Sequence, residues 1–338
     1  MLYVRVLKAI YGMIESALRW YELFSSTLTD MGFTINPYDK CTANKIINGS
    51  QCTVCWYVDD NKVSHVDEKV IDMVVDEIEA KFGELSRSKG NKHTFLGMDI
   101  EILPDKKVAI STPQHIEEVI SDLGEEIKGD GANPAKSKLF NVSTSCKLSE
   151  EKPELFHKLV AKLLWITQRS RPDLETGVSF LYTRVQEPTE EDWTKLVRVM
   201  SFLKSTRCDR RIIGADSLNS LRTFVDASYA VHTNMRGHTG GVMTLGWGMV
   251  HARTSKQELN AKSSTEIELI GISEYIPFKI WLTNFLEAQG YKLKDKVLYQ
   301  DNMSAIRMKN RKELCTGNSR HISIRYFFCQ RQSGQERI

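Results

Sequence analysis

The sequence has no long hydrophobic run and no regular pattern of cysteines. No stretch approaches the roughly eighteen consecutive apolar residues of a membrane span, and the first residues, MLYVRVLKAIYGM, lack the apolar core and cleavage site of a signal peptide. The 7 cysteines are odd in number and scattered, which argues against a disulfide framework. These absences predict an intracellular protein that is not in a membrane.

The chain also lacks a strong net charge and a credible zinc motif. Its formal net charge is only +3, so any nucleic-acid binding must rest on local sites. Cys52 and Cys55 are close in sequence, but in a strand they point to opposite faces. The composition does allow two or three domains, because 338 residues that are 41% hydrophobic can build more than one core.

Hydrophobic periodicity predicts alternating helices and hairpins in the N-terminal part. Apolar residues at helical spacing predict a helix within 11–31, followed by strands around an Asn-Gly turn and a second turn at 59–61. A helix over 68–82 and a hairpin that turns at Pro104 and Asp105 come next. Residues 124–153, rich in Gly, Ser, Lys and Glu, predict an interdomain connection.

The C-terminal part has a different pattern. Two helices are expected over 154–169 and 190–205. From about residue 216, three strands, helix-like stretches and a fourth strand predict a compact α/β domain. The expected fold class is therefore multidomain, α+β with an α/β domain at the C-terminal end.

Three acidic residues stand where this α/β domain can bring them together. Asp226 ends an apolar strand, Asp301 directly follows another, and Glu266 lies in the first turn of a helix behind Ser-Ser-Thr. Strand-end carboxylates gather at one rim of a sheet, and their mutual repulsion favours a bound divalent cation, Mg²⁺ or alternatively Mn²⁺. This set suits two-metal phosphodiester cleavage. The alternative is that each is an ordinary surface acid.

A second acidic pair, Asp59 and Asp60, interrupts two apolar strands in TVCWYVDDNKVSHV. The simplest interpretation is a polar hairpin turn, in which Asp is common. The alternative is a metal-binding hairpin that projects into a nucleic-acid cleft. Tyr57, the aromatic residue beside the pair, favours this alternative.

Six motifs, YVDD, HTFLGMDI, FVDAS, SSTEIEL, QDNMSAI and RHISIRYFF, together resemble the polymerase and ribonuclease H region of a copia-type retrotransposon Pol polyprotein. The resemblance extends from about residue 3 to about residue 330. It implies a partial reverse transcriptase palm and thumb over 1–130, a helical connection over 131–215 and a ribonuclease H-like α/β domain over 216–338. It also implies RNA-directed DNA polymerase and ribonuclease H activities, with template-primer nucleic acid, an RNA:DNA hybrid and deoxynucleotides as partners, and leaves the oligomeric state open. The implied location is cytoplasmic, with a nuclear one as the alternative.

The resemblance implies roles for individual residues. The palm carboxylates that bind Mg²⁺ would be Asp59 and Asp60. The ribonuclease H metal carboxylates would be Asp226, Glu266 and Asp301, with His321 near the position of a fourth. Residues implied to contact the substrate lie in the helix YGMIESALRWY, beside YVDD and in the hairpin that grips the primer, namely Gly12, Trp20, Tyr57, Phe95, Leu96 and Gly97.

The sequence departs from the family pattern at several places. The third palm carboxylate of the family belongs to an upstream motif resembling DVKTAF, which the residues before Tyr11 do not contain. Ile14 and Ala17 replace the usual lysine and proline, and Ser323 replaces the acid of the family's His-Ile-Asp. We therefore expect almost no polymerase turnover by this chain alone and weak ribonuclease H cleavage. The alternative is a non-catalytic, nucleic-acid-binding remnant of a degenerate element.

Overall fold

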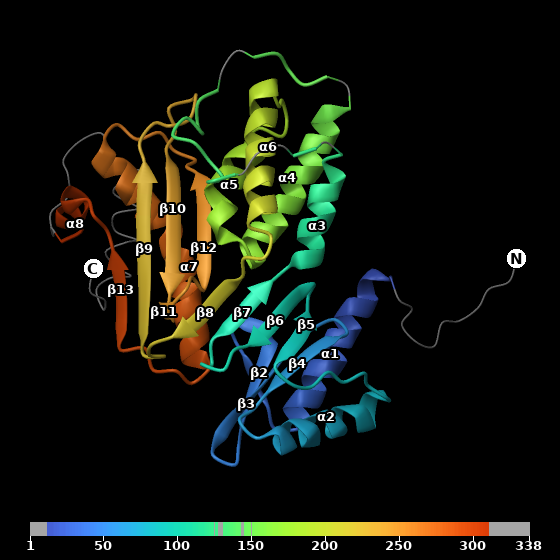
Figure 1. Cartoon of the computed structure of the whole chain (residues 1–338). Helices are drawn as coiled ribbons and strands as arrows, with labels where there is room; N and C mark the ends of the chain where they lie inside the picture. The colour runs from blue at the N-terminus through green and yellow to red at the C-terminus, as the bar shows by residue number, and fades with distance from the viewer. Residues whose placement is uncertain (1–11, 125, 128–130, 143–144, 150, 311–338) are drawn as a thin grey trace, which may run out of the picture. The chain divides into compact units, whose positions relative to one another are not determined.

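The computed structural model of the chain describes residues 12–124, 126–127, 131–142, 145–149 and 151–310 (Figure 1). Within these residues, helices and several separate sheets alternate, which agrees with the predicted mixed α and β class. No helix in this part of the chain is both long enough and apolar enough to cross a membrane. Packing divides the chain into two units, Met1–Gly90 with Asn284–Tyr291, and Asn91–Thr283 with Lys292–Ile338. The predicted boundaries at 130 and 215 stay predictions.

The first unit is an antiparallel sheet with two helices. Its strands follow one another in chain order and its helices flank them in sequence: α1 Ile14–Asp30, β1 Thr34–Asn36, β2 Asp39–Ile47, β3 Ser50–Tyr57, β4 Asp60–Ser64 and α2 Glu68–Phe82. Phe24 of α1, Val74 of α2 and Val54 of β3 are among its buried residues, so the apolar faces of both helices share one core with the sheet. Asn48 and Gly49 both have positive φ, which confirms the predicted Asn-Gly hairpin turn.

A segment from far along the chain completes this unit. The Asn36 side-chain amide donates to the Phe285 carbonyl at 3.1 Å, and the Asn44 amide donates to the Gln289 side chain. The sheet therefore depends on residues 245 and 249 positions away in sequence for some of its polar partners.

The second unit begins with an antiparallel sheet in the order β11-β8-β7-β6-β5. Its strands are β5 Lys92–Phe95, β6 Met98–Ile102, β7 Val108–Ser111, β8 Arg211–Ala215 and β11 Gly246–Trp247. The turn between β6 and β7 contains Pro104 and Asp105, as predicted. Strand β7 pairs with β8 across about a hundred residues of sequence, a pairing that local patterns do not reveal.

A group of helices forms the main core of this unit. They are α3 Pro113–Asp122, α4 Lys152–Arg169, the short 3₁₀ helix η1 Pro172–Leu174, α5 Glu175–Tyr182 and α6 Glu190–Ser205. The predicted connection between domains contributes Ile127, Leu139 and Leu148 to the same core. Its described residues therefore pack against the helices and do not act as a free linker.

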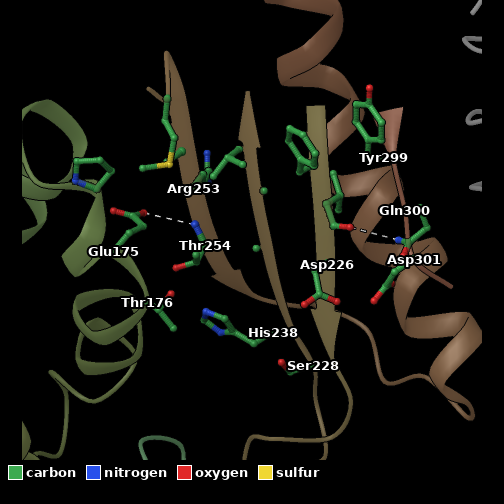
Figure 2. Close-up of a pocket in the computed structure, with 18 of the residues that line it drawn as sticks. Glu175, Thr176, Asp226, Ser228, His238, Arg253, Thr254, Tyr299, Gln300 and Asp301 are labelled. Atoms are coloured by element: carbon green, nitrogen blue, oxygen red, sulfur yellow. Dashed lines mark hydrogen bonds between the residues drawn. The ribbon is translucent and has the colours of Figure 1, made fainter. Parts of the chain in front are cut away.

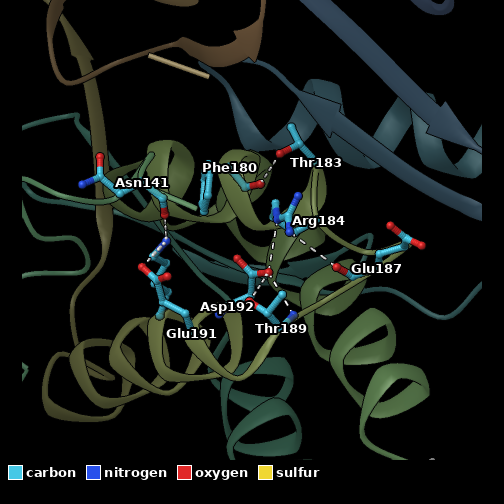
Figure 3. Close-up of polar contacts among 9 residues, drawn as sticks. Asn141, Phe180, Thr183, Arg184, Glu187, Thr189, Glu191 and Asp192 are labelled. Atoms are coloured by element: carbon cyan, nitrogen blue, oxygen red, sulfur yellow. Dashed lines mark hydrogen bonds and ion pairs between the residues drawn. The ribbon is translucent and has the colours of Figure 1, made fainter. Parts of the chain in front are cut away.

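Polar contacts anchor the start of α6 (Figure 3). The Thr189 hydroxyl and the Asp192 carboxylate cap each other's backbone N–H groups in a capping box. Arg184, which follows α5, directs its Nε to the Asp192 carboxylate at 3.1 Å, and the Asp192 side chain is only 1% exposed. These contacts join the loop after α5 to the first turn of α6.

The last part of the second unit is a sheet in the order β12-β10-β9-β13, with a long helix beside it. Its elements are β9 Ser220–Ser228, β10 His238–Thr244, β12 His251–Lys256, α7 Ser264–Ala288, β13 Asp295–Tyr299 and α8 Met303–Asn310; the residues of α7 from Asn284 on belong to the first unit. The first three strands are antiparallel, and β13 runs parallel to β9. This arrangement confirms the predicted order of three strands, helix and fourth strand, although one continuous helix that contains Pro277 replaces the helix-like stretches expected there.

Glycines allow α7 to lie close to this sheet. A Cβ at Gly241 of β10 would lie 2.2 Å from the Tyr275 ring of α7, which is far inside contact distance. A Cβ at Gly271, which lies in α7 itself, would be 3.2 Å from the Cβ of Ala227 in β9. Because the side chains at these positions are absent, the helix can approach the strands that carry the candidate site.

Candidate functional site

Three carboxylates meet at one edge of the sheet that contains β9 and β13. One oxygen each from Asp226, Glu268 and Asp301 lies within 4.8 Å of the other two. Among the residues that the structure describes, no other group of three or more His, Cys, Asp or Glu side chains is arranged in this way. This cluster is the candidate site.

Strand register explains why Asp226 and Asp301 are neighbours. Tyr299 of β13 pairs with Phe224 of β9 in the parallel pair. The two aspartates each lie two residues further on, so they come to the same edge on the same side of the sheet. Successive side chains of β9 alternate between the two faces of the sheet, so Val225 is buried and the next residue, Asp226, is exposed.

Glu268 approaches the same edge from α7 and has the most unusual environment of the three. Its side chain is 7% exposed and accepts a hydrogen bond from Gln300 Nε2 at 3.0 Å. Burial, together with the charges of Asp226 and Asp301, raises the pKa of Glu268 to about 7. Without a cation, three carboxylates this close repel one another unless one of them holds a proton.

A cavity of about 650 Å³ adjoins two of the carboxylates (Figure 2). Asp226 and Asp301 line one side of it, and Glu175 and Thr176 of α5 line another. Glu175 is buried and accepts the Thr254 backbone N–H at 3.4 Å; burial raises the pKa of the Glu175 carboxyl. The site is therefore an open, partly polar hollow rather than an enclosed apolar pocket.

The structure places Glu268, and not the predicted Glu266, in the cluster. Glu266 Oε2 accepts the Lys262 backbone N–H at 2.6 Å, and the Glu266 N–H donates to Ser263 Oγ at 3.2 Å, so this residue closes the start of α7. Positions two apart on a helix differ by about 200°, so the two glutamates face nearly opposite directions. Glu268 lies between Ile267 and Leu269, which are both buried, and the sequence carries no local signal of which face of α7 packs on the sheet.

Asp59 and Asp60 lie in the first unit at the hairpin between β3 and β4. Val58 and Asp59 form the turn, and Asp60 pairs with Tyr57 across the strands. Both aspartates are exposed, and in the described part of the chain they belong to no group of three potential ligands. The predicted hairpin is confirmed, although its turn lies one to two residues earlier than predicted, because Asp60 and Asn61 already belong to β4; the metal-binding role stays a prediction.

The residues predicted to contact substrate near this hairpin differ in exposure. Trp20 Nε1 donates to the Val58 carbonyl at 2.7 Å, and its ring packs edge-on against Phe82, so the half-buried Trp20 joins the turn to α2. Tyr57 is 60% exposed and is accessible to a ligand. Gly12 has φ of +90° with open space around it.

The predicted primer-gripping residues form a hairpin tip in the second unit. Phe95 ends β5, and Leu96 and Gly97 form the two-residue turn before β6, both with positive φ. A Cβ at Gly97 would lie 3.0 Å from the His115 ring, so the tip packs closely on α3. His321 and Ser323 lie outside the described residues.

Along most of its length the chain is similar to Pol and Gag-Pol polyproteins of transposons. It is 24% identical over 339 aligned residues, 98% of its length, to the retrovirus-related Pol polyprotein from transposon TNT 1-94 of Nicotiana tabacum. It is 25% identical over 345 residues, 99% of its length, to that from transposon RE2 of Arabidopsis thaliana, and 24% over 321 residues, 90% of its length, to the transposon Ty1-ER2 Gag-Pol polyprotein of Saccharomyces cerevisiae.

The chain corresponds to only part of each of these relatives. It covers 25%, 23% and 18% of the tobacco, Arabidopsis and yeast polyproteins respectively. No protein-family model matches the chain, and no solved structure is significantly similar to it. The comparisons therefore relate this chain to a segment of a retrotransposon polyprotein.

Proposed function

We propose that the chain is a reverse transcriptase and ribonuclease H segment of a retrotransposon Pol polyprotein, and that its best-supported activity is cleavage of RNA in an RNA:DNA hybrid. The observation that carries this proposal is the cluster of Asp226, Glu268 and Asp301, found in a chain whose homologues are Pol polyproteins. The family resemblance implies Asp226 and Asp301 as metal ligands. For the third ligand we propose Glu268 instead of Glu266.

The donor set of this cluster suits Mg²⁺, or Mn²⁺ in its place. All three donors are carboxylate oxygens, which hard divalent cations prefer, and their closeness is unfavourable unless positive charge offsets it. A bound ion would supply charge that stabilises the oxygens of a phosphodiester during hydrolysis. Asp226 and Asp301 are exposed beside the cavity, where a nucleic-acid strand can reach them. Glu268 is buried and does not line the cavity.

For the first unit we propose binding of template-primer nucleic acid. Tyr57, Asp59 and Asp60 are exposed together at the β3–β4 hairpin, as a hairpin that meets a primer end requires. Because only two carboxylates meet there among the described residues, we expect incorporation of deoxynucleotides by this chain alone to be close to zero.

Cleavage of a labelled RNA:DNA hybrid tests the ribonuclease H proposal. We expect the full chain to cleave the RNA strand with Mg²⁺ or Mn²⁺ and not with EDTA. Asp226→Asn should lower the rate by about a hundredfold or more, because loss of a metal ligand removes several kcal/mol of stabilisation, roughly tenfold for each 1.4 kcal/mol. The matched control is Glu266→Gln, which should keep the rate within about threefold because Glu266 is outside the cluster.

Binding of the same hybrid, followed by fluorescence anisotropy, completes the test. Asp226→Asn should still bind the hybrid, since the change affects one side chain at the cleavage site. Hybrid binding by the unmodified chain with no metal-dependent cleavage would overturn the enzymatic proposal and favour a non-catalytic, nucleic-acid-binding remnant.

A further inference from the structure

We propose that Gln300 is a positioning residue that holds Glu268 in the carboxylate cluster; the inference rests on the metal-binding role proposed above. Gln300 follows the last residue of β13 and immediately precedes Asp301. Its side-chain amide is directed toward β9 (Figure 2) and donates from Nε2 to Glu268 Oε2 at 3.0 Å. No other side-chain hydrogen bond to the Glu268 carboxylate is found among the described residues.

The need for such a donor follows from charge. Glu268 is buried, and the other two carboxylates of the cluster repel it. An amide donor offsets part of that repulsion and gives one Glu268 oxygen a fixed direction, which leaves the carboxylate oriented for a cation. The Ala227 backbone N–H of β9 also interacts with this carboxylate, and the Gln300 amide adds the side-chain donor that gives Oε2 its direction.

The remaining contacts of Gln300 fix its own position. Nε2 also lies 3.4 Å from the Val225 carbonyl of β9, and Oε1 accepts the Asn302 backbone N–H at 3.0 Å. Asn302 Oδ1 in turn accepts the N–H groups of Ser304 and Ala305, each at 3.0 Å, at the start of α8. The Gln300 amide therefore links α7, β9 and the backbone N–H of Asn302. These contacts need both a donor and an acceptor at the end of the side chain.

Mn²⁺ binding by the full chain, measured by electron paramagnetic resonance, tests this role. We expect Gln300→Met, which keeps the length of the side chain and removes both hydrogen-bonding groups, to weaken Mn²⁺ binding by about 10- to 100-fold. The melting temperature is measured in parallel, so that a loss of affinity can be compared with a loss of stability.

The matched control is Gln257→Met. Gln257 is also a buried glutamine of the second unit, and its Nε2 donates to Thr239 Oγ1 and the Ile267 carbonyl, each at 3.0 Å, and to no carboxylate. We expect this variant to lose thermal stability while its Mn²⁺ affinity stays within about threefold of the unmodified chain. Asn302→Ala, which removes the α8 cap and keeps the Asn302 N–H, should also stay within about threefold.

The outcomes separate this inference from the proposal on which it rests. If the unmodified chain binds Mn²⁺ and Asp226→Asn does not, the metal site stands; equal affinity of Gln300→Met and the unmodified chain then overturns the role of Gln300 alone. Equal weakening by Gln300→Met and Gln257→Met also overturns it, because the effect then follows general loss of structure. If the unmodified chain binds no Mn²⁺, both proposals fail.

Discussion

Glu268 shows how the surroundings of one residue set its chemistry. Glu266 and Glu268 are both glutamates in the first two turns of α7, but only the second is buried beside Asp226 and Asp301. Burial and the two neighbouring charges raise the pKa of Glu268 to about 7, from the ordinary value near 4.5. In the metal-free protein the folded state therefore retains this proton more tightly than the unfolded chain, and its stability decreases as pH rises toward 7.

We expect Mn²⁺ affinity to fall as the pH drops below about 7. A cation must displace the Glu268 proton, so each pH unit below the pKa of Glu268 should lower the apparent affinity about tenfold. Titrations of the full chain with Mn²⁺ between pH 5.5 and 8 measure this change. Glu268→Gln, which cannot titrate, serves as the control and should bind more weakly with little dependence on pH. An affinity that is constant over this range in the unmodified chain would contradict the assignment.

At the scale of the elements, the close approach of α7 to the sheet decides whether the site forms. Gly241 and Gly271 leave room for the helix against β10 and β9, and Tyr275 occupies the space beside Gly241. The helix carries Glu268, and the strands carry Asp226 or lead into Asp301. The separation of helix and sheet therefore also sets the separation of the three carboxylates.

Gly241→Ala should destabilise the second unit and weaken metal binding together. Its Cβ would lie 2.2 Å from the Tyr275 ring, which forces the helix or the ring to move, and such overpacking costs about 1–3 kcal/mol. Gly240→Ala is the matched control, because the nearest side-chain atom to its Cβ, Thr254 Cγ2, is 3.7 Å away on the opposite face. Urea denaturation and Mn²⁺ titration of both variants measure the two effects. Equal behaviour of the two alanine variants would show that close packing at Gly241 does not matter.

Several elements could be predicted from sequence because local signals define them. The helices over 68–82 and 190–205 have the expected bounds, since apolar periodicity coincides with an N-cap aspartate at Asp67 and a capping box at Thr189. The five-stranded sheet could not be predicted in the same way, because β7 and β8 pair across the intervening helices. Asp226 and Asp301 were identified because strand ends are visible in sequence, whereas the face of α7 that meets the sheet is not.

At the scale of the whole molecule, the chain consists of two units that differ in what they offer a ligand. The first presents an exposed aromatic and two exposed aspartates at a hairpin, and the second contains the cluster of three carboxylates. The chain spans a quarter or less of the Pol polyproteins quoted above. For this chain the activities of the whole polyproteins are therefore proposals, and the two units can be compared within the full chain.

Mn²⁺ should protect amides of the second unit from hydrogen exchange and leave those of the first unaffected. Binding at about 100 times the dissociation constant stabilises the bound unit by about 2.7 kcal/mol, which slows exchange through its unfolding by up to about a hundredfold. Mass spectrometry of peptides from β9 and β13, compared with peptides from β2 and β3, measures the difference. The Asp226→Asn variant is the control and should show no protection. Equal slowing in both units would contradict a site confined to the second.

The sequence by itself determined the local elements, the order of the motifs and the strand-end positions of Asp226 and Asp301, because periodicity, capping and turn residues act over a few positions. Only the tertiary structure decided that Glu268 completes the cluster and that Gln300 donates a hydrogen bond to it. The physical reason is that the direction of a helical side chain is settled by which face of the helix packs on the sheet. That packing depends on residues far apart in sequence, such as Gly241 and Tyr275.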